Sequence, residues 1–368
     1  MTDDFNVFQN AFNQQSMQVF SDNGRGALWL KLKSIMRNDC IQAFAQQSGL
    51  SLSGRTLKDK FRALFTLFER DVARGHALLD AFLRHQNAIQ FRLLDEEAII
   101  AELYKLQHYA WGGDYQNSLD RFLVTKYIKH PFYTYAELCR NLDTDIKQTV
   151  RGYLLNSWYN HWSSIVIEHI FKAHPGVLPT VGQIKGVDFF LANIPFDLKI
   201  TYFPSEFMKL SRQQRGLPPE ITYLKQQARK LSLRFDSQQS EAGQLQQITA
   251  RLKDLPEQGN EVLQTLNTQR QEILAQTQQN PQPLLRWLYE HQGERRFGAE
   301  NRLFLILVDS EDFSRSWELK RNIAWIRPQV NSYLDACLQA PLQQKMPLHF
   351  SFKNQHYHVL TDALFLIK

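Results

Sequence analysis

The sequence predicts a mixed α/β protein in which helices dominate the N-terminal part and a mixed β-sheet follows. Apolar residues recur at three- and four-residue spacing through residues 1–150, as they do in amphipathic helices. Two later segments, GVDFFL and PFDLKIT, have the composition of strands, and NRLFLILVD is an apolar run of the kind that is buried on both faces of a sheet. A chain of 368 residues is long enough for two or three domains.

The first predicted domain, residues 1–150, is helical. Thr56 and Asp59 form a candidate capping box at the start of one helix. The apolar stripe of that helix is expected to lie in a core and comprises Phe61, Leu64, Phe65 and Phe68. Helical segments are expected near residues 3–20, 27–48, 56–72, 75–92 and 95–108.

Residues 117–150 predict three short helices separated by turns, an order loosely like a helix-turn-helix. A second capping box, formed by Thr134 and Glu137, marks the start of the middle helix. Four basic side chains of this stretch are candidates for contacts with DNA phosphates, namely Lys126, Lys129, Lys147 and Arg151. The alternative is an ordinary helical connector with solvated lysines.

The segment from Trp158 to Tyr202 predicts a helix, a loop and two strands joined by a tight turn. The connection from Ala192 to Pro195 is short enough for an antiparallel hairpin, which can set Asp188 beside Asp197. Side chains alternate along a strand, so Asp197 and Lys199 share one face. The opposite face is expected to be buried and carries Phe196, Leu198 and Ile200.

These residues indicate a site for a hard cation. Glu168 lies twenty residues before Asp188 on the predicted helix and can face the same point as Asp188, Asp197 and Lys199. Carboxylate oxygens are the ligands that Mg²⁺ prefers, and a bound Mg²⁺ can hold a phosphate and lower the pKa of a bound water. The alternative is a solvated hairpin in which Asp188 and Glu168 pair with Lys185 or Lys199. The apolar surroundings argue against it, because a carboxylate in a buried sheet needs a partner or a metal.

A helix glutamate, a strand aspartate and an Asp-x-Lys strand on one hairpin resemble the PD-(D/E)xK nuclease superfamily. Glu168, Asp188, Asp197 and Lys199 match its motif one by one, whereas Val187 stands where the family often has proline. The resemblance implies a restriction-endonuclease-like fold, with a mixed sheet and the helix first.

The resemblance also implies roles for the matched residues. Asp188 and Asp197 are expected to bind Mg²⁺, for which Mn²⁺ can substitute, with help from the backbone carbonyl of Leu198. Glu168 is expected to complete the metal site, and Lys199 to position the attacking water and stabilise the transition state.

The nuclease core is expected to comprise residues 151–205 and 283–368, interrupted by a helical insertion at 206–282. A helix is predicted from Ile221 to Phe235, and two apolar seams then predict a helical hairpin that resembles a coiled coil, turned at Pro256 and Gly259. The insertion can serve dimerisation, partner binding or clamping of DNA, or can pack on its own domain.

The apolar run NRLFLILVD is expected to lie in the centre of the sheet beside the Asp197 strand. Arginine can bind phosphate through two N–H groups at once. The basic residues on either side of the run are therefore candidate contacts with DNA phosphates, or else surface charges: Arg295, Arg296, Arg302, Arg315, Lys320 and Arg321.

Charge and cysteine content agree with a protein that binds a polyanion in a reducing compartment. The formal net charge is +6, and Cys40, Cys139 and Cys337 lie far apart, without zinc or disulfide spacing. The acidic start MTDDFNVFQ lacks a signal-peptide core, and no apolar run is long enough to span a membrane. We expect a cytoplasmic protein without membrane contact.

The predicted function is that of a Mg²⁺-dependent deoxyribonuclease that hydrolyses phosphodiester bonds, an endonuclease of bacterial restriction or antiviral (anti-phage) defence. DNA is the expected partner, with a homodimer or a partner protein bound through the insertion. Two alternatives stay open. The chain can be a non-catalytic DNA-binding or scaffold subunit of a defence or repair complex, or a regulator that binds DNA through residues 117–150.

Overall fold

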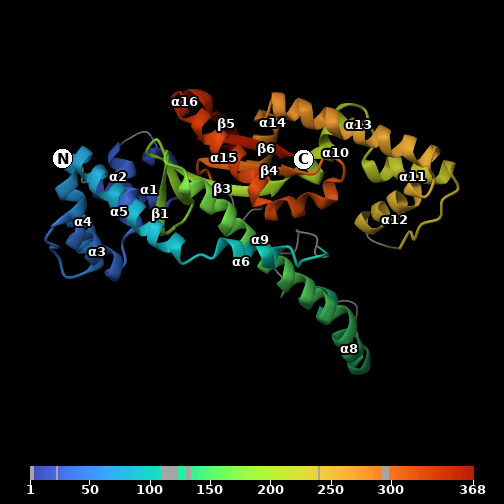
Figure 1. Ribbon diagram of the computed structural model, residues 1–368, viewed down its shortest axis with the longest axis horizontal. Coiled ribbons are helices and arrows are strands. Elements are labelled where there is room, and N and C mark those ends of the chain that lie inside the picture. The colour runs from blue at the N-terminus through green and yellow to red at the C-terminus, as the bar shows by residue number, and fades with distance from the viewer. Residues whose placement is uncertain are drawn as a thin grey trace.

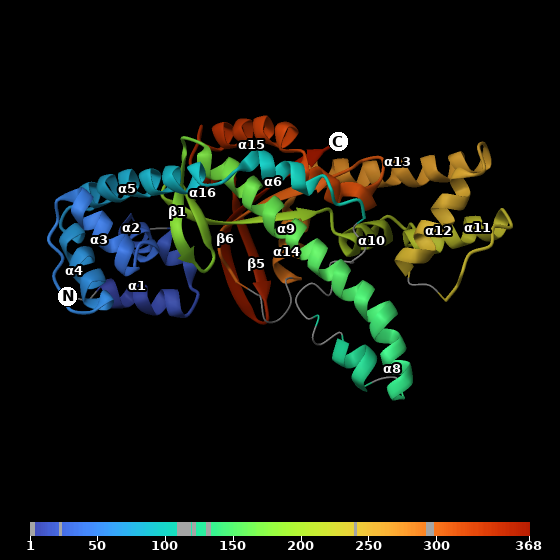
Figure 2. The same ribbon diagram turned by 60° about the horizontal axis from the view of Figure 1, so that its bottom comes forward.

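The computed structural model describes residues 4–21, 24–108, 119, 123–129, 134–238, 241–291 and 298–368. The molecule is elongated, with N-terminal helices at one end, a sheet in the middle and a small group of helices at the other end (Figure 1). A helical rod projects from the middle, as both views show (Figure 2).

One six-stranded mixed sheet forms the centre, in the order β1-β2-β3-β4-β6-β5. β1, β2 and β3 are antiparallel, β4 is parallel to both β3 and β6, and β5 is antiparallel to β6. The mixed α/β class is therefore confirmed. The strands are β1 (Val177–Ile184), β2 (Val187–Leu191), β3 (Ile194–Tyr202), β4 (Arg302–Val308), β5 (Pro347–Phe352) and β6 (Gln355–Ile367).

The first strand corrects the sequence prediction. The expected loop before the hairpin contains β1, so three strands rather than two follow the helix. Pro179 and Gly182 hide this strand in the sequence, because proline cannot donate to a ladder and glycine breaks the apolar alternation. The β1–β2 register is irregular between Pro179 and Ile184, which an edge strand tolerates.

β4 is buried at every position, as its apolar sequence predicted. Alternate side chains of β4 enter two different cores. Leu305 packs on the face covered by α9 (Lys147–Ala173) and α15 (Ile323–Cys337). Ile306 packs on the opposite face, against side chains of three helices: α10 (Ser205–Gln214), α13 (Gln258–Gln279) and α14 (Gln282–Glu290).

The N-terminal region is helical as predicted, and the expected helices at 3–20 and 27–48 each divide into two. The Thr56–Asp59 capping box is present, and the predicted stripe from Phe61 to Phe68 is buried. The same core includes Ile184 of β1 and Phe190 of β2, so the helices pack against the edge of the sheet. The elements are α1 (Asp4–Asn13), η1 (Met17–Phe20), α2 (Gly24–Ser34), α3 (Asn38–Ser48), α4 (Leu57–Glu69), α5 (Val72–Arg92) and α6 (Glu96–Leu103).

A buried lysine joins the helical region to the β2–β3 turn. Lys31 of α2 is fully buried, and its Nζ donates to Asp80 Oδ1 at 2.6 Å and to Asn193 Oδ1 at 2.7 Å. Nδ1 of His76 lies 2.9 Å from the same nitrogen. The turn that carries the candidate hairpin is therefore fixed from outside the sheet.

The expected helix-turn-helix is wrong where the structure describes it. The second capping box, at Thr134, is present, but no turn separates the second helix from the third. Helical conformation continues from α8 (Tyr135–Asn141) through a π-helical stretch, η4 (Leu142–Ile146), into α9. The polar residues of NLDTD interrupt the apolar pattern, but they do not end the helix. The backbone there adopts a π-helical conformation instead of a turn. Residues 130–133, which include the first expected turn, lie outside the described residues.

The insertion contains the predicted helix and the predicted hairpin, which pack together as a three-helix cluster. α12 (Glu241–Lys253) and α13 form the expected hairpin with its turn at Pro256, and α11 (Glu220–Lys230) packs against both. α11 ends earlier than predicted, with Ser232 in the left-handed region at φ 54°. A Cβ atom at Gly259 would lie 1.9 Å from the backbone oxygen of Leu252, which explains the glycine in the first turn of α13.

The remaining helical elements are η5 (Phe313–Arg321), a 3₁₀ helix, and α16 (Leu342–Lys345). α15 follows η5, and β5 and β6 form an antiparallel pair at the C-terminal end of the described chain. No helix within the described residues has both the length and the apolar character needed to cross a membrane.

Gly182 gives a test of how the helical region sits on β1. A Cβ atom at Gly182 would lie 2.2 Å from the backbone oxygen of Ser34 in α2. We expect Gly182→Ala to lower the free energy of unfolding by about 1–3 kcal/mol, because backbone cannot yield as a flexible side chain can. The measurement is the urea midpoint at unchanged m-value.

The control for this substitution is Gly152→Ala in α9, where no described atom would approach the new methyl group within 4 Å. It should leave stability unchanged or raise it by up to about 1 kcal/mol through helix propensity. Wild-type stability in Gly182→Ala would contradict the close approach of α2 to β1.

Candidate functional site

The candidate site lies where β3 exchanges one neighbouring strand for another. β2 pairs with β3 from Leu191 opposite Ile194 to Phe189 opposite Phe196. The intervening turn is tight, with Ala192 and Asn193 at φ 49° and 64°, as the sequence predicted. From Asp197 onward β3 pairs with β4 instead. Asp188 and Asp197 therefore lie at the point where the β2–β3 ladder ends.

The carboxylate of Asp188 connects β2 to β3 at the point where the two strands diverge. Its Oδ2 accepts a hydrogen bond from the backbone N–H of Leu198 at 2.7 Å. The group that binds Asp188 is the N–H of Leu198, and the predicted role of the Leu198 carbonyl as a metal ligand stays a prediction. The two strands thus stay connected through a side chain after their backbone pairing has ended.

Asp197 and Lys199 form an ion pair along β3. Lys199 Nζ donates to Asp197 Oδ1 at 2.8 Å. The Asp197 side chain is 10% exposed and the Lys199 side chain 47% exposed, so the pair extends from the protein interior to solvent. Phe196 and Leu198 enter the core on the other face of the sheet, as the alternation predicted.

Asp188 lies in an electrostatic environment that disfavours its charge. Burial raises the pKa of Asp188 to about 6, and the nearby carboxylates of Glu168 and Asp197 add to the increase. The hydrogen bond from Leu198 opposes it only in part. Three carboxylates therefore interact electrostatically at one end of the β2–β3 pair, a pattern found at functional sites and also in structural ion networks.

Glu168 reaches this point from α9. The helix buries Ile167 and Ile170 against the sheet, which places the intervening Glu168 at the margin of the packed face. Its Oε1 forms an ion pair with Lys172 Nζ at 2.5 Å, one helical turn later. α9, β2 and β3 thus each carry part of the predicted motif, and the Glu168 carboxylate is near enough to Asp188 to raise its pKa.

The carboxylates offer suitable ligands for Mg²⁺ but do not form a closed cluster. Within the described residues, no group of three or more His, Cys, Asp or Glu side chains is close enough to hold a metal ion. Asp188, Asp197 and Glu168 each have a cationic or N–H partner already. The oxygen chemistry fits a hard cation, and the raised pKa of Asp188 reflects a repulsion that such a cation would relieve. Its ligands would have to be shared with these present partners.

Two residues at the start of β4 extend the site. Arg302 faces Asp197 across the parallel pair, and its Nε donates to Asp197 Oδ2 at 3.1 Å. Its Nη2 donates to Glu300 Oε2 at 2.7 Å. Arg302 was expected to contact DNA phosphate, but its side chain is only 5% exposed and binds these two carboxylates instead. Glu300 was missed in the sequence, although a charged residue just before a buried strand is a usable signal.

Lys320 also differs from its predicted role as a phosphate contact. Its side chain is buried, donates to Asn160 Oδ1 at 3.0 Å and lies over the ring of Tyr202. Burial lowers the pKa of Lys320 to about 8. A lysine held in this way faces the interior, so contact with a phosphate would require it to leave its partners.

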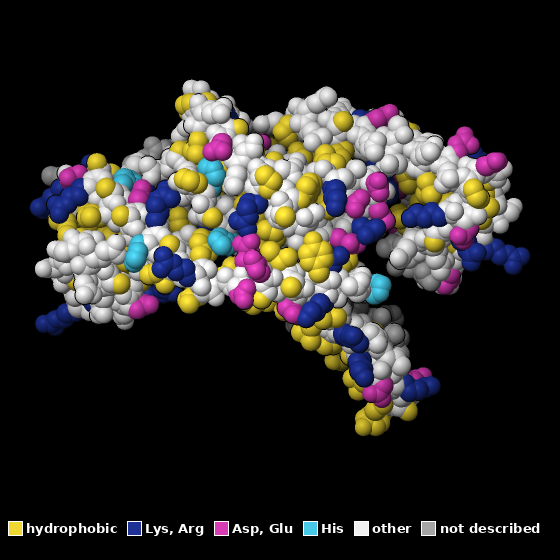
Figure 3. Space-filling view, viewed as in Figure 1, with side chains coloured by type: hydrophobic (Ala, Val, Ile, Leu, Met, Phe, Trp, Pro, Cys, Tyr) yellow, Lys and Arg dark blue, Asp and Glu magenta, His cyan; other side chains and the backbone are white. Residues whose placement is uncertain are grey.

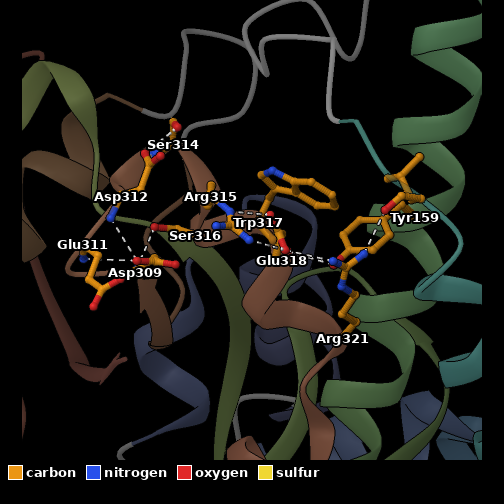
Figure 4. Close-up of polar contacts among 11 residues, drawn as sticks. Tyr159, Asp309, Glu311, Asp312, Ser314, Arg315, Ser316, Trp317, Glu318 and Arg321 are labelled. Carbon is orange, nitrogen blue, oxygen red and sulfur yellow. Dashed lines mark hydrogen bonds and ion pairs between the residues drawn. The ribbon is translucent and has the colours of Figure 1, made fainter. Parts of the chain in front are cut away.

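The remaining predicted phosphate contacts divide into two groups. Arg315 and Arg321 lie on η5, where Glu318 is placed between them and binds both (Figure 4). Arg321 also donates to the Leu106 carbonyl, whereas the Arg315 side chain is 60% exposed. Arg315 alone of these two is open to a ligand. Arg295 and Arg296 lie outside the described residues.

Comparison with known proteins finds no match among protein-family models, curated proteins or solved structures. The chemistry of the residues around Asp188 and the topology of the sheet are therefore the basis for assigning a function.

The raised pKa of Asp188 makes a prediction for the metal-free protein. A carboxyl group with a raised folded-state pKa contributes stability below its unfolded-state pKa of 3.8, and this stability is lost as the pH rises through about 6. A rise of this size corresponds to roughly 3 kcal/mol at most. In EDTA, Asp188→Asn should therefore be more stable than wild type at pH 8, by about 1–3 kcal/mol, and the difference should shrink at pH 5.

Urea unfolding of both proteins at the two pH values measures this difference. Asp254→Asn, which replaces an exposed aspartate after α12, is the matched control and should show no such dependence on pH. An equal stability difference at pH 5 and pH 8 would contradict the electrostatic environment described for Asp188.

Proposed function

We propose that the protein is a Mg²⁺-dependent deoxyribonuclease that hydrolyses phosphodiester bonds in DNA. The observation that carries this proposal is the placement of Asp188, Asp197 and Lys199 where β2 and β3 diverge, with the Glu168 carboxylate near enough to raise the pKa of Asp188. Burial and mutual repulsion there disfavour a carboxylate charge that a divalent cation would favour.

The sheet topology supports the same proposal. α9 precedes three antiparallel strands, the Asp-x-Lys sequence lies on the third, and β4 is parallel to that strand. This order agrees with the helix-first mixed sheet that the resemblance to the PD-(D/E)xK superfamily implies. A restriction-endonuclease-like core is therefore our proposed fold assignment.

Asp188 and Asp197 would hold the Mg²⁺, or Mn²⁺ in its place, with Glu168 at its margin. The metal, when bound, would polarise a phosphate oxygen and lower the pKa of a bound water. Lys199 is half-exposed, so its Nζ can donate to a water or a phosphate oxygen while keeping Asp197 as a partner. Its positive charge would stabilise negative charge that develops during phosphodiester cleavage.

The projecting rod carries basic side chains that would contact DNA phosphates. Arg140, Lys147 and Arg151 are exposed on the continuous helix formed by α8, η4 and α9. Basic side chains follow the length of this rod in the space-filling view (Figure 3). With a formal net charge of +6, the protein would attract a polyanion at low ionic strength.

We further propose an endonuclease role in bacterial restriction or anti-phage defence. Cutting both strands of a duplex calls for two active sites, so a homodimer or a partner protein is expected. The three-helix cluster of α11, α12 and α13 is the candidate interface, since it extends beyond the sheet at one end of the molecule (Figure 1).

A second candidate is a non-catalytic DNA-binding or scaffold subunit. The observation that favours it is the engagement of both Asp197 oxygens, one by Lys199 and one by Arg302. A carboxylate fixed between two cations can serve as a structural ion pair without binding metal.

Plasmid cleavage separates the two candidates. We expect wild-type protein to nick or linearise a plasmid with Mg²⁺ and to lose this activity in EDTA. Asp197→Ala and Lys199→Ala should each lower the rate roughly 100-fold or more, because charge stabilisation at a reacting centre is typically worth that much. Asp254→Ala and Lys253→Ala, at exposed positions near the end of α12, are matched controls and should cleave normally.

Cleavage that persists in both site variants would place the active site elsewhere. DNA binding without cleavage in the wild type, unchanged in Asp197→Ala, would favour the scaffold subunit. Thermal unfolding of each variant establishes that a lost activity is not a lost fold.

A further inference from the structure

Four charged side chains of alternating sign form a row across β3 and β4. Lys199 binds Asp197, Asp197 binds Arg302, and Arg302 binds Glu300. We propose that Arg302, itself held by Glu300, is a positioning residue that fixes the Asp197 carboxylate for metal binding. This inference rests on the proposed metal-dependent nuclease and assigns Arg302 a role other than contact with DNA.

The Arg302 guanidinium is held on several sides. Its side chain is 5% exposed, and it lies 5.0 Å from the ring centroid of Tyr289 in α14. The hydroxyl of Tyr289 donates to the Glu300 backbone oxygen at 2.7 Å. Ring, guanidinium and carboxylate therefore restrict one another, which leaves Arg302 little freedom to choose another orientation.

Glu300 is itself fixed by close backbone packing. A Cβ atom at Gly186, in the β1–β2 turn at φ 75°, would lie 2.5 Å from Glu300 Cγ. A Cβ atom at Gly298 would lie 2.2 Å from Glu300 Oε2. The carboxylate thus occupies space that glycine leaves open, and one of the two glycines, Gly186, is two residues along the chain from Asp188.

The strand register aligns Arg302 with Asp197. The two residues are paired directly in the parallel β3–β4 ladder, and the Asp197 N–H donates to the Asn301 carbonyl at 2.9 Å. Arg302 binds Oδ2 of Asp197, while Oδ1 faces the half-exposed Lys199. The two carboxylate oxygens of Asp197 therefore have different surroundings. Oδ2 is directed inward, and Oδ1 is directed toward the solvent side of the site.

A purely structural ion pair explains this arrangement less well. Apolar side chains of similar volume often match or exceed the stability of buried ion pairs. Arg302 also keeps a buried Nη1 without a hydrogen-bond partner among the described residues, which lowers its value as a stabilising group. Hydrogen bonds that orient a metal-ligating carboxylate, by contrast, typically change metal affinity 10- to 100-fold.

The test measures Mn²⁺ binding without DNA, by the electron paramagnetic resonance signal of free Mn²⁺. The variants are Arg302→Met, Arg302→Lys and the double variant Glu300→Gln with Arg302→Met. The double variant removes both charges together, so it folds even if Arg302→Met alone leaves Glu300 unpaired. Arg270→Met is the matched control, because Arg270 forms a similar part-buried pair with Glu220 in the three-helix cluster.

We expect the double variant to bind Mn²⁺ about 10- to 100-fold more weakly than wild type, with affinity partly restored in Arg302→Lys. Arg270→Met should keep wild-type affinity, even where its midpoint in urea is lower. Wild-type or tighter Mn²⁺ affinity in the double variant, with binding still abolished by Asp197→Ala, would overturn the positioning role alone. If Asp197→Ala removes no Mn²⁺ binding from the wild type, the proposed metal site and this inference are both overturned.

Discussion

The parallel pairing of β3 with β4 is the contact on which the rest of the structure depends. It begins at Asp197 opposite Arg302 and brings together parts of the chain that are separated by the entire α10–α14 segment. β4 contributes one row of side chains to each face of the sheet, so both hydrophobic cores include side chains of this strand. Closing so long a connection is entropically unfavourable, and complete burial of β4 offsets that cost.

Charges at the first residue pair of this ladder set it apart from the apolar pairs that follow. Asn301 binds Asp197, Pro195, Ser21 and Leu360 through its backbone and side-chain groups, so the start of β4 is fixed from several directions. Next to this rigid point, Asp188 has an unfavourable charge at neutral pH in the absence of metal. Rigid surroundings can maintain such an unfavourable arrangement, and proteins use this at functional sites.

Three helical parts of the molecule lie around the sheet. The N-terminal helices fix the β2–β3 turn through Lys31, and the projecting rod has basic residues on its surface. The three-helix cluster lies beyond the sheet at the opposite end of the molecule from the N-terminal helices (Figure 1). The fixed turn also limits how far Asp188 and Asp197 can move apart, because both strands end in it. A substrate as long as DNA would have surface to contact beyond the carboxylates, in keeping with the proposed function.

The sequence by itself determined the elements whose signals are local. The capping boxes at Thr56 and Thr134, the buried stripe of α4, the hairpin turn at Asn193 and the central position of β4 all follow from side-chain spacing or backbone preference. The alternation in PFDLKIT also placed Asp197 and Lys199 on one face. These features depend on residues within a few positions of one another, so their physics can be evaluated without the rest of the chain.

Only the tertiary structure decided which charges are paired and which are exposed. Each arginine has a glutamate partner within three residues, so nothing local distinguishes the buried Arg302 from the exposed Arg315. Arg302 is buried because Asp197 of β3 and the Tyr289 ring of α14 pack against it. The strand at Pro179 was missed for the same reason, because it is stabilised by its neighbours rather than by its own sequence. The environment of Asp188, which combines burial with carboxylates from α9 and β3, exists only once those elements have packed together.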